Sequence, residues 1–91
     1  MAQVVVTLKI MPESPQTNLK EIEKKATKMI AEFKGEVGKV EQVPVAFGIK
    51  SLNLFFVMDE DIGSTEALEN DVKQIEGVNS VDVIDVRRAV G

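Results

Sequence analysis

The sequence predicts an α+β protein with four strands and two helices, in the order strand, helix, strand, strand, helix, strand. Its 91 residues suffice for one hydrophobic core and are too few for two domains, so residues 1–91 are expected to form a single domain. Hydrophobic residues make up 44% and charged residues 29% of the chain, a balance typical of globular proteins. Apolar residues recur at two-residue steps in some segments and at three- and four-residue steps in others, which distinguishes strands from helices.

The first half of the chain predicts a strand followed by a helix. Pro12 and Pro15 end the strand, because proline donates no backbone hydrogen bond to a ladder. Asn18 can cap the following helix, which Gly35 would end. The apolar face of the strand comprises Val4, Val6, Leu8 and Ile10. The buried stripe of the helix comprises Leu19, Ile22, Ala26, Met29, Ile30 and Phe33.

Two strands come next. Residues 37–46 predict a weaker strand, which Pro44 confines to a sheet edge or a bulge. Residues 49–60 give the clearest strand pattern in the chain, because successive side chains separate onto two faces. One of these faces comprises Leu52, Leu54, Phe56 and Met58, and the other Ser51, Asn53, Phe55 and Val57.

A second helix and a last strand complete the chain. The helix is expected to run from a cap at Ser64 to about Ile75, with Gly77 beyond its end. The last strand is expected to reach Val86, followed by a short tail that starts at Arg87. This order of elements predicts a ferredoxin-like βαββαβ sandwich, in which both helices cover one face of a four-stranded antiparallel sheet. The other face of the sheet would stay open.

Composition excludes several classes of function. The chain has no Cys and no His, which removes thiolate metal sites, cysteine nucleophiles and the usual general base near neutral pH. A net charge of −4 argues against a nucleic-acid partner, because phosphate neutralisation requires a basic surface. No apolar stretch approaches the roughly 20 residues of a membrane span, and the N-terminus lacks the pattern of a signal peptide. We therefore expect a cytoplasmic interaction protein, not an enzyme, with no cofactor and no membrane partner.

Known chemistries of this fold find little support. The acidic run at residues 59–63 lacks the spacing of a calcium loop, so no metal site is expected. Acylphosphatase-like activity needs a glycine-rich loop with an arginine after the first strand, where this chain has an acidic, proline-bearing loop. RNA-recognition domains stack bases on sheet aromatics, and Phe55 would lie on the open face, but the glycine–aromatic alternation of those domains is missing. The lysines at positions 20–28 lie among glutamates, which is typical of a solvated helix face, with a nucleic-acid patch as the alternative.

Two features point beyond a generic fold. One is the corner from Pro44 to Lys50, where an aromatic, Phe47, precedes Gly48 at a strand junction. Phe47 either folds back onto the core or contacts a partner. The other is the pair Arg87 and Arg88, the only arginines in the chain. This pair is either part of a frayed terminus or a second contact.

The segment "VPVAFGIKSLNLFFVMDED", residues 43–61, resembles the signature of the guanine-nucleotide-exchange domain family of translation elongation factor 1-beta. The family has a Pro–x–x–Phe–Gly–Ile–Lys corner, an apolar strand and an acidic turn, as this chain does from Pro44 to Asp61. The resemblance extends over the whole chain in element order and includes the start of the first helix. The chain length is similar to that of the archaeal form.

The resemblance implies a partner, elongation factor 1-alpha, from which the protein would promote GDP release so that GTP can reload. It also implies partner-binding roles for Pro44, Phe47, Gly48 and Lys50, since the aromatic of this corner touches the GTPase in that family. Eukaryotic members end in a basic residue that enters the magnesium and phosphate region of the GTPase. Counting through the last strand places Arg88 there, with Arg87 as the alternative; this chain has Arg for Lys and continues to Gly91.

Three functions follow in order of preference. The first is a guanine nucleotide exchange factor that acts without covalent chemistry, as a monomer. The second is an RNA-binding ferredoxin-like module associated with translation. The third is a small-molecule regulatory domain that works by pairing sheets in a dimer.

Overall fold

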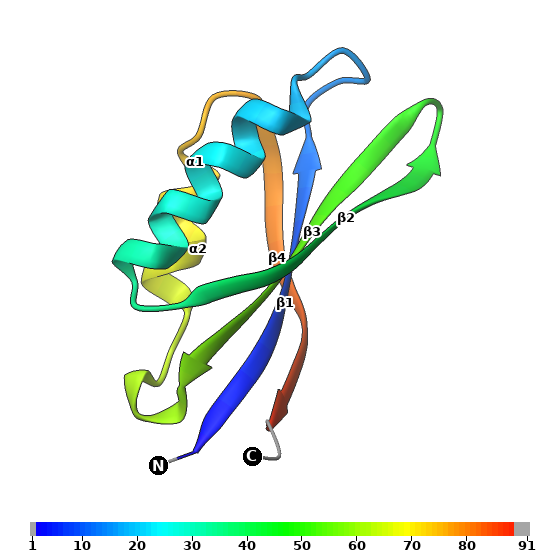
Figure 1. The fold of residues 1–91 in the computed structure, drawn as a ribbon. Coiled ribbons are helices and arrows are strands. Elements are labelled where there is room, and N and C mark those ends of the chain that lie inside the picture. The colour runs from blue at the N-terminus through cyan, green and yellow to red at the C-terminus, as the bar shows by residue number, and fades with distance from the viewer. Residues whose placement is uncertain (1, 89–91) are drawn as a thin grey trace.

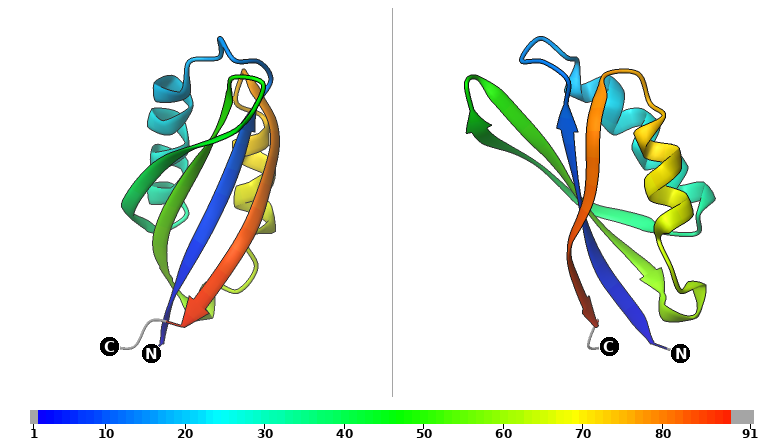
Figure 2. Two further views of the ribbon diagram at one scale, coloured as in Figure 1. Left: turned by 90° about the vertical axis from the view of Figure 1, so that its right-hand side faces the viewer. Right: turned by 180° about the vertical axis from the view of Figure 1, so that it is seen from behind.

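The computed structural model describes residues 2–88 and contains the predicted elements in the predicted order (Figure 1). The four strands form one antiparallel sheet in the order β2-β3-β1-β4, and both helices cover the same face of it (Figure 2). The ferredoxin-like α+β prediction is confirmed. The elements are β1 (Gln3–Pro12), α1 (Leu19–Glu32), β2 (Glu36–Ala46), β3 (Ile49–Asp59), the 3₁₀ helix η1 (Glu60–Ile62), α2 (Glu66–Lys73) and β4 (Val78–Arg88).

The core lies between the helices and the two central strands. The predicted apolar faces of β1 and β3 are almost completely buried, as is the central part of the α1 stripe. Leu19, Met29 and Phe33 of that stripe are only partly buried and pack at its margin. The core residues, each at most 8% exposed, are Val6, Leu8, Ile10, Ile22, Ala26, Ile30, Leu52, Leu54, Phe56, Met58, Leu68, Val72, Ile75 and Val78.

The first helix begins as predicted and ends differently. The Asn18 carboxamide oxygen accepts hydrogen bonds from the backbone N–H groups of Lys20 and Glu21, which caps the N-terminus of α1. At the other end it is Lys34, not Gly35, that has the positive φ, 69°. Gly35 is needed for space instead, because a Cβ there would lie 2.8 Å from Ile30 Cγ2. The prediction that Gly35 ends the helix was therefore wrong by one residue, because Lys34 takes the left-handed conformation after the C-cap Phe33.

Two other predicted boundaries are wrong. The second helix is shorter than expected: Thr65 is the N-cap and α2 ends at Lys73, although the Ser64 hydroxyl does accept a hydrogen bond from the Glu66 N–H. Ile75 is buried just beyond the helix, so hydrophobic burial rather than helical hydrogen bonding accounts for its apolar character. The last strand extends to Arg88, so Arg87 and Arg88 belong to the sheet and not to a tail. The rest of the predicted tail, residues 89–91, lies outside the described residues.

Both edge strands of the sheet are irregular. In β2 the register shifts place one extra residue, Gly38, between Val37 and Lys39, and another, Val45, beside Pro44. In β4 a similar shift leaves Ile84 opposite no single residue of β1. The prediction that Pro44 would lie on an edge strand or in a bulge is confirmed, because β2 is an edge strand and the register shifts immediately after Pro44. Within residues 2–88, no helix has the length and apolar character needed to cross a membrane.

Candidate protein-binding site

The tip of the β2–β3 hairpin displays Phe47 to solvent. Ala46 pairs with Ile49, so Phe47 and Gly48 alone form the turn. Their φ angles are 53° and 77°, and turns with two positive φ values join hairpins best when Asn or Asp precedes Gly. The Phe47 residue is 95% exposed, which excludes the interpretation that its ring folds back onto the core.

The backbone of Phe47 is unfavourable for this residue type. A positive φ is uncommon outside Gly, Asn and Asp and brings the Cβ close to the backbone, at a cost of about 1 kcal/mol or more. Burial of the ring does not offset this cost, because the ring is exposed. A strained backbone that persists without a packing gain is typical of a binding or catalytic position.

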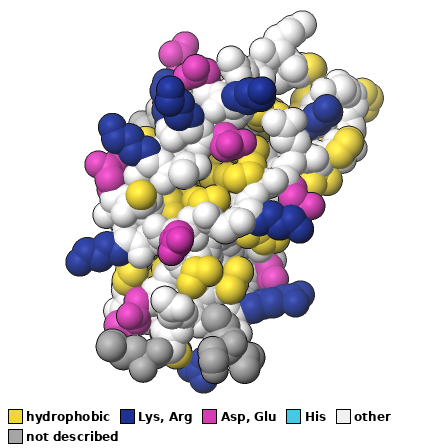
Figure 3. All heavy atoms as spheres, viewed as in Figure 1, with side chains coloured by type: hydrophobic (Ala, Val, Ile, Leu, Met, Phe, Trp, Pro, Cys, Tyr) yellow, Lys and Arg dark blue, Asp and Glu magenta, His cyan; other side chains and the backbone are white. Residues whose placement is uncertain are grey.

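Other apolar side chains surround the tip. Val43 is 39% and Val45 is 49% exposed, and both lie on β2 beside Phe47 in sequence. Space-filling shows hydrophobic side chains gathered over the β2–β3 hairpin, at the upper right (Figure 3). The outer half of the hairpin projects beyond the helix layer (Figures 1 and 2), so neither helix covers this end of the sheet. We call Val43, Val45 and Phe47 the hairpin tip.

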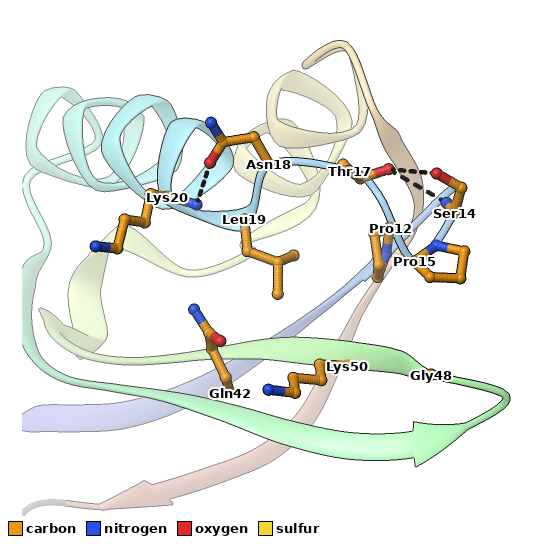
Figure 4. Close-up of a pocket in the computed structure, with 10 residues that line it drawn as sticks. All are labelled: Pro12, Ser14, Pro15, Thr17, Asn18, Leu19, Lys20, Gln42, Gly48 and Lys50. Carbon is orange, nitrogen blue, oxygen red and sulfur yellow. Dashed lines mark hydrogen bonds between the residues drawn. The ribbon is translucent and has the colours of Figure 1, made fainter.

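The remaining predicted residues of the corner flank the tip. Pro44 pairs with Lys50 across the two strands. Lys50 lies on the helix side of the hairpin and lines a cleft beneath it (Figure 4). Gly48 is close to the β1–α1 loop, since a Cβ at Gly48 would lie 3.9 Å from Pro15 Cβ. Pro44, Phe47, Gly48 and Lys50 thus form one contiguous surface.

The two predicted arginines lie at the end of β4 and are already paired. The Arg87 Nε donates to Asp85 Oδ2 at 2.8 Å, and Arg88 Nη2 donates to Glu60 Oε1 at 2.7 Å. Arg87 is opposite Val5 and Arg88 is opposite Val4. Successive strand residues face opposite sides of a sheet, so Arg87 is on the open face and Arg88 on the helix face. The pair cannot act as one basic surface.

The structure separates the arginines from the hairpin tip. In Figure 1 the tip is at the top and β4 ends at the bottom, beside the start of β1. Strand β3 runs between these ends over Ile49–Asp59, and a strand rises about 3.3 Å per residue, so about 30 Å lies between them. The longest dimension of the molecule is 42 Å. The predicted site residues therefore lie in two groups at opposite ends of the sheet.

Sequence reasoning missed several residues of these ends. It did not single out Val43 and Val45 as site residues. Apolar residues close together on an expected edge strand do indicate an exposed apolar surface, so the sequence contained a usable signal. It also missed Glu60 and Asp85, whose carboxylates hold the arginines. Glu60 is 28 positions from Arg88, so no local pattern could have indicated that pair.

The acidic run at residues 59–63 has a structural explanation. Among residues 2–88, no group of three or more acidic side chains is placed to hold a metal ion. In the acidic run, the Asp59 carboxylate accepts a hydrogen bond from the Asp61 N–H at 2.9 Å and so caps η1. Exposed apolar and aromatic side chains such as those of the hairpin tip are typical of protein interfaces.

Comparison with known proteins identifies the family. Residues 5–89 match the EF-1 guanine nucleotide exchange domain. The chain belongs to this family. It is 42% identical over 88 residues to elongation factor 1-beta of Methanothermobacter thermautotrophicus, which covers 97% of this chain and 98% of the relative. Elongation factor 1-beta of Staphylothermus marinus is also 42% identical, over 89 residues, with 97% and 98% covered. That of Thermofilum pendens is 35% identical over the full length of both chains.

The family resemblance inferred from residues 43–61 is thus confirmed, and the relatives support a role as an EF-1 nucleotide exchange factor. Solved structures share the fold at low identity. The ACT domain of GTP pyrophosphokinase of Chlorobium tepidum superposes with a TM-score of 0.61 at 18% identity, covering 90% of this chain and 99% of that one. The C-terminal domain of the MgtC protein of Mycobacterium tuberculosis gives 0.63 at 13% identity, covering 97% and 88%. These structures show the fold alone.

Proposed function

We propose that the protein binds elongation factor 1-alpha and accelerates release of GDP from it, so that GTP can rebind during protein synthesis. The observation that carries the proposal is the exposed, backbone-strained Phe47 at the hairpin tip, in a chain of the EF-1 exchange family. An aromatic ring presented to solvent beside two exposed valines gives the anchor area that interface hot spots favour. The protein would act in the cytoplasm and as a monomer.

In this mechanism the hairpin tip supplies binding and the arginine end acts on the nucleotide site. GDP is held mainly through its phosphates and Mg²⁺. A cation brought to that region, or a displaced switch segment, removes part of this hold. Each loss of about 1.4 kcal/mol weakens nucleotide binding about tenfold. Arg88 is the preferred cation, because counting through the last strand places it where the family has its basic residue, and Arg87 is the alternative.

No covalent step is needed. Linkage requires only that the protein bind the nucleotide-free GTPase more tightly than the GDP-bound form. Pro44, Gly48 and Lys50 shape the surface around Phe47, since Pro44 and Lys50 pair below the turn and Gly48 completes it. The protein is then an exchange factor and not an enzyme in the sense of bond chemistry.

The test is release of labelled GDP from elongation factor 1-alpha in Mg²⁺ buffer, with this protein in catalytic amounts. We expect release to be faster than the spontaneous rate and to saturate as the protein concentration rises. Release at the spontaneous rate at every concentration would contradict the proposal. Salt-sensitive retention of RNA without any effect on GDP release would favour the RNA-binding alternative.

A further inference from the structure

A cleft of about 480 Å³ lies beneath the hairpin (Figure 4). Three segments form it: the β1–α1 loop, the first turn of α1 and the helix side of the hairpin. Leu19 projects into it from α1, while Gln42 and Lys50 approach from the hairpin. Gly48 closes one end next to Pro15. The volume is suited to a few side chains of a partner rather than to a large ligand.

One wall of the cleft, the β1–α1 loop, is held in place by hydrogen bonds within the protein. The loop is held by hydrogen bonds from the Thr17 N–H to the Ser14 carbonyl and from the Ser14 N–H to the Thr17 hydroxyl, both at 3.2 Å. The Glu13 N–H donates to the Gly77 carbonyl at 2.9 Å, which ties the loop to the start of β4. Pro12 and Pro15 further restrict it. A preformed surface loses less conformational entropy on binding than a flexible one.

The lining is apolar and cationic. Leu19, Pro12 and Pro15 supply apolar surface, and Lys20 and Lys50 supply positive charge. No Asp or Glu of the described part of the chain lines the cleft, although the chain carries 15 acidic residues and a net charge of −4. Among residues 2–88, neither lysine takes part in an ion pair. The cleft is therefore a local positive site on an acidic protein.

Hydrogen-bonding capacity in the cleft favours an acceptor as its occupant. The Asn18 carboxamide oxygen already accepts from the Lys20 and Glu21 N–H groups, at 3.1 and 3.3 Å. The Ser14 and Thr17 hydroxyls lie 3.3 Å apart and share a hydrogen bond. Of the polar side chains that point into the cleft in Figure 4, Lys50 has an ammonium group, which only donates, and Gln42 has a carboxamide, which donates and accepts.

We propose that this cleft binds a segment of the GTPase partner in which an apolar side chain lies beside a carboxylate. The apolar side chain would pack on Leu19 and Pro15, and the carboxylate would meet Lys50, with the positive charge of Lys20 on the neighbouring first turn of α1. The cleft adjoins the hairpin tip through Gly48, so one partner can contact both. This inference rests on the proposed function and extends its interface from the tip to the first turn of α1.

The experiment compares charge reversals at two positions of α1 in the GDP-release assay. Lys20→Glu places a carboxylate at the cleft, whereas Lys28→Glu makes the same change in net charge at an exposed position that does not line it. We expect the protein concentration for half-maximal release to rise about tenfold for Lys20→Glu and less than about twofold for Lys28→Glu. The reason is that the new carboxylate repels a carboxylate of the partner strongly only at the interface, whereas salt screens more distant charges. The maximal rate should change in neither.

A second variant that should bind the partner more tightly is needed, because misfolding could explain a loss of affinity in Lys20→Glu but not a gain. Gln42→Lys adds a third cation at the cleft, and we expect it to lower the half-maximal concentration by about threefold. Equal effects of Lys20→Glu and Lys28→Glu, or a weaker Gln42→Lys protein, would overturn the inference and leave the exchange function standing. RNA retention that depends on Lys20 while GDP release does not would assign the cleft to phosphate instead. A wild-type protein that fails to accelerate release would overturn the exchange function itself, and this inference with it.

Discussion

The two ends of the sheet expose their residues in different ways. At the hairpin tip, Phe47 is 95% exposed on a backbone with positive φ, and nothing in the described fold accounts for an aromatic there. At the other end, Arg87 and Arg88 lie in a regular strand and each is paired with a carboxylate. The backbone conformation of Phe47 costs stability, and no burial of its ring offsets that cost. The arginines are stabilised in the free protein and must exchange their partners before they can act on another molecule.

This difference teaches that exposure alone does not rank candidate residues. The side chain of Arg88 is 70% exposed, yet its ion pair with Glu60 gives it a structural explanation. Phe47 has no such explanation, so the functional interpretation rests more firmly on the tip. The variants below separate the two ends by whether activity and stability change together.

The largest effect is expected for Phe47→Ala. Loss of a central aromatic anchor removes about 2–3 kcal/mol of binding, so the efficiency of GDP release should fall by about 30- to 150-fold. The free energy of unfolding in denaturant should change by less than about 0.5 kcal/mol, because the ring packs on nothing in the core. Ile84→Ala, which truncates another exposed apolar side chain, is the control and should retain activity. A large loss of stability with normal activity per folded molecule would contradict this interpretation of Phe47.

Arg88→Gln should lower the maximal rate of GDP release about tenfold, with a smaller change in the half-maximal concentration. The reason is that a cation at the nucleotide site acts on release rather than on docking. Arg87→Gln is the matched control, since its side chain is on the opposite face. If Arg87→Gln has the larger effect, Arg87 is the acting residue; if both variants release GDP at the wild-type rate, the arginine end has no role. Point variants are preferable to truncation after Val86, because truncation would remove the backbone pairing of Arg87 and Arg88 with β1 as well as their side chains.

Phe47→Asn should stabilise the protein while abolishing most of its activity. Asn adopts a positive φ more readily than Phe, and Asn–Gly is a favoured pair for such turns. We expect the free energy of unfolding to rise by about 0.5–1 kcal/mol, measured by denaturant titration against the wild type. If Phe47→Asn destabilises the protein instead, the backbone of Phe47 is not strained.

The smallest effect is expected for Glu60→Gln, which breaks the ion pair with Arg88 and keeps the size of the side chain. Both side chains are substantially exposed, at 44% and 70%, so solvent screens their attraction. The free energy of unfolding should fall by less than about 1 kcal/mol. A loss of several kcal/mol in the same titration would mean that this end is held together by the pair, and that releasing Arg88 to a partner is too costly.

Much of the fold could be predicted because its signals are local. The alternation in β1 and β3, the stripe of α1 and the Asn18 cap each lie within a few residues of one another, and hydrophobic burial enforces them. The end of α2 could not be found in this way, because Ile75 is apolar for the core and not for the helix. The positive φ of Lys34 could not be predicted, because the neighbouring Gly35 is the residue type expected to have it. Gly35 is small for another reason, since Ile30 leaves no space for a Cβ there.

The candidate sites were harder to predict than the fold. Phe47 was found because its motif is contiguous in sequence. The cleft was not, because Leu19, Gln42 and Lys50 come from three segments that only the folded sheet brings together. The separation of the tip from the arginines depends on strand direction and register, which a list of motifs does not contain.

The irregular edges of the sheet bear on how this protein behaves at high concentration. An uninterrupted edge strand with exposed apolar side chains is a template for adding strands from other molecules, which leads to aggregation. Here each edge strand carries a bulge, and two of the exposed apolar residues, Val45 and Ile84, are themselves the extra residues. A bulge bends the strand and interrupts its row of free N–H and C=O groups. The uninterrupted part of each edge that another copy could pair with is therefore shorter than the strand itself.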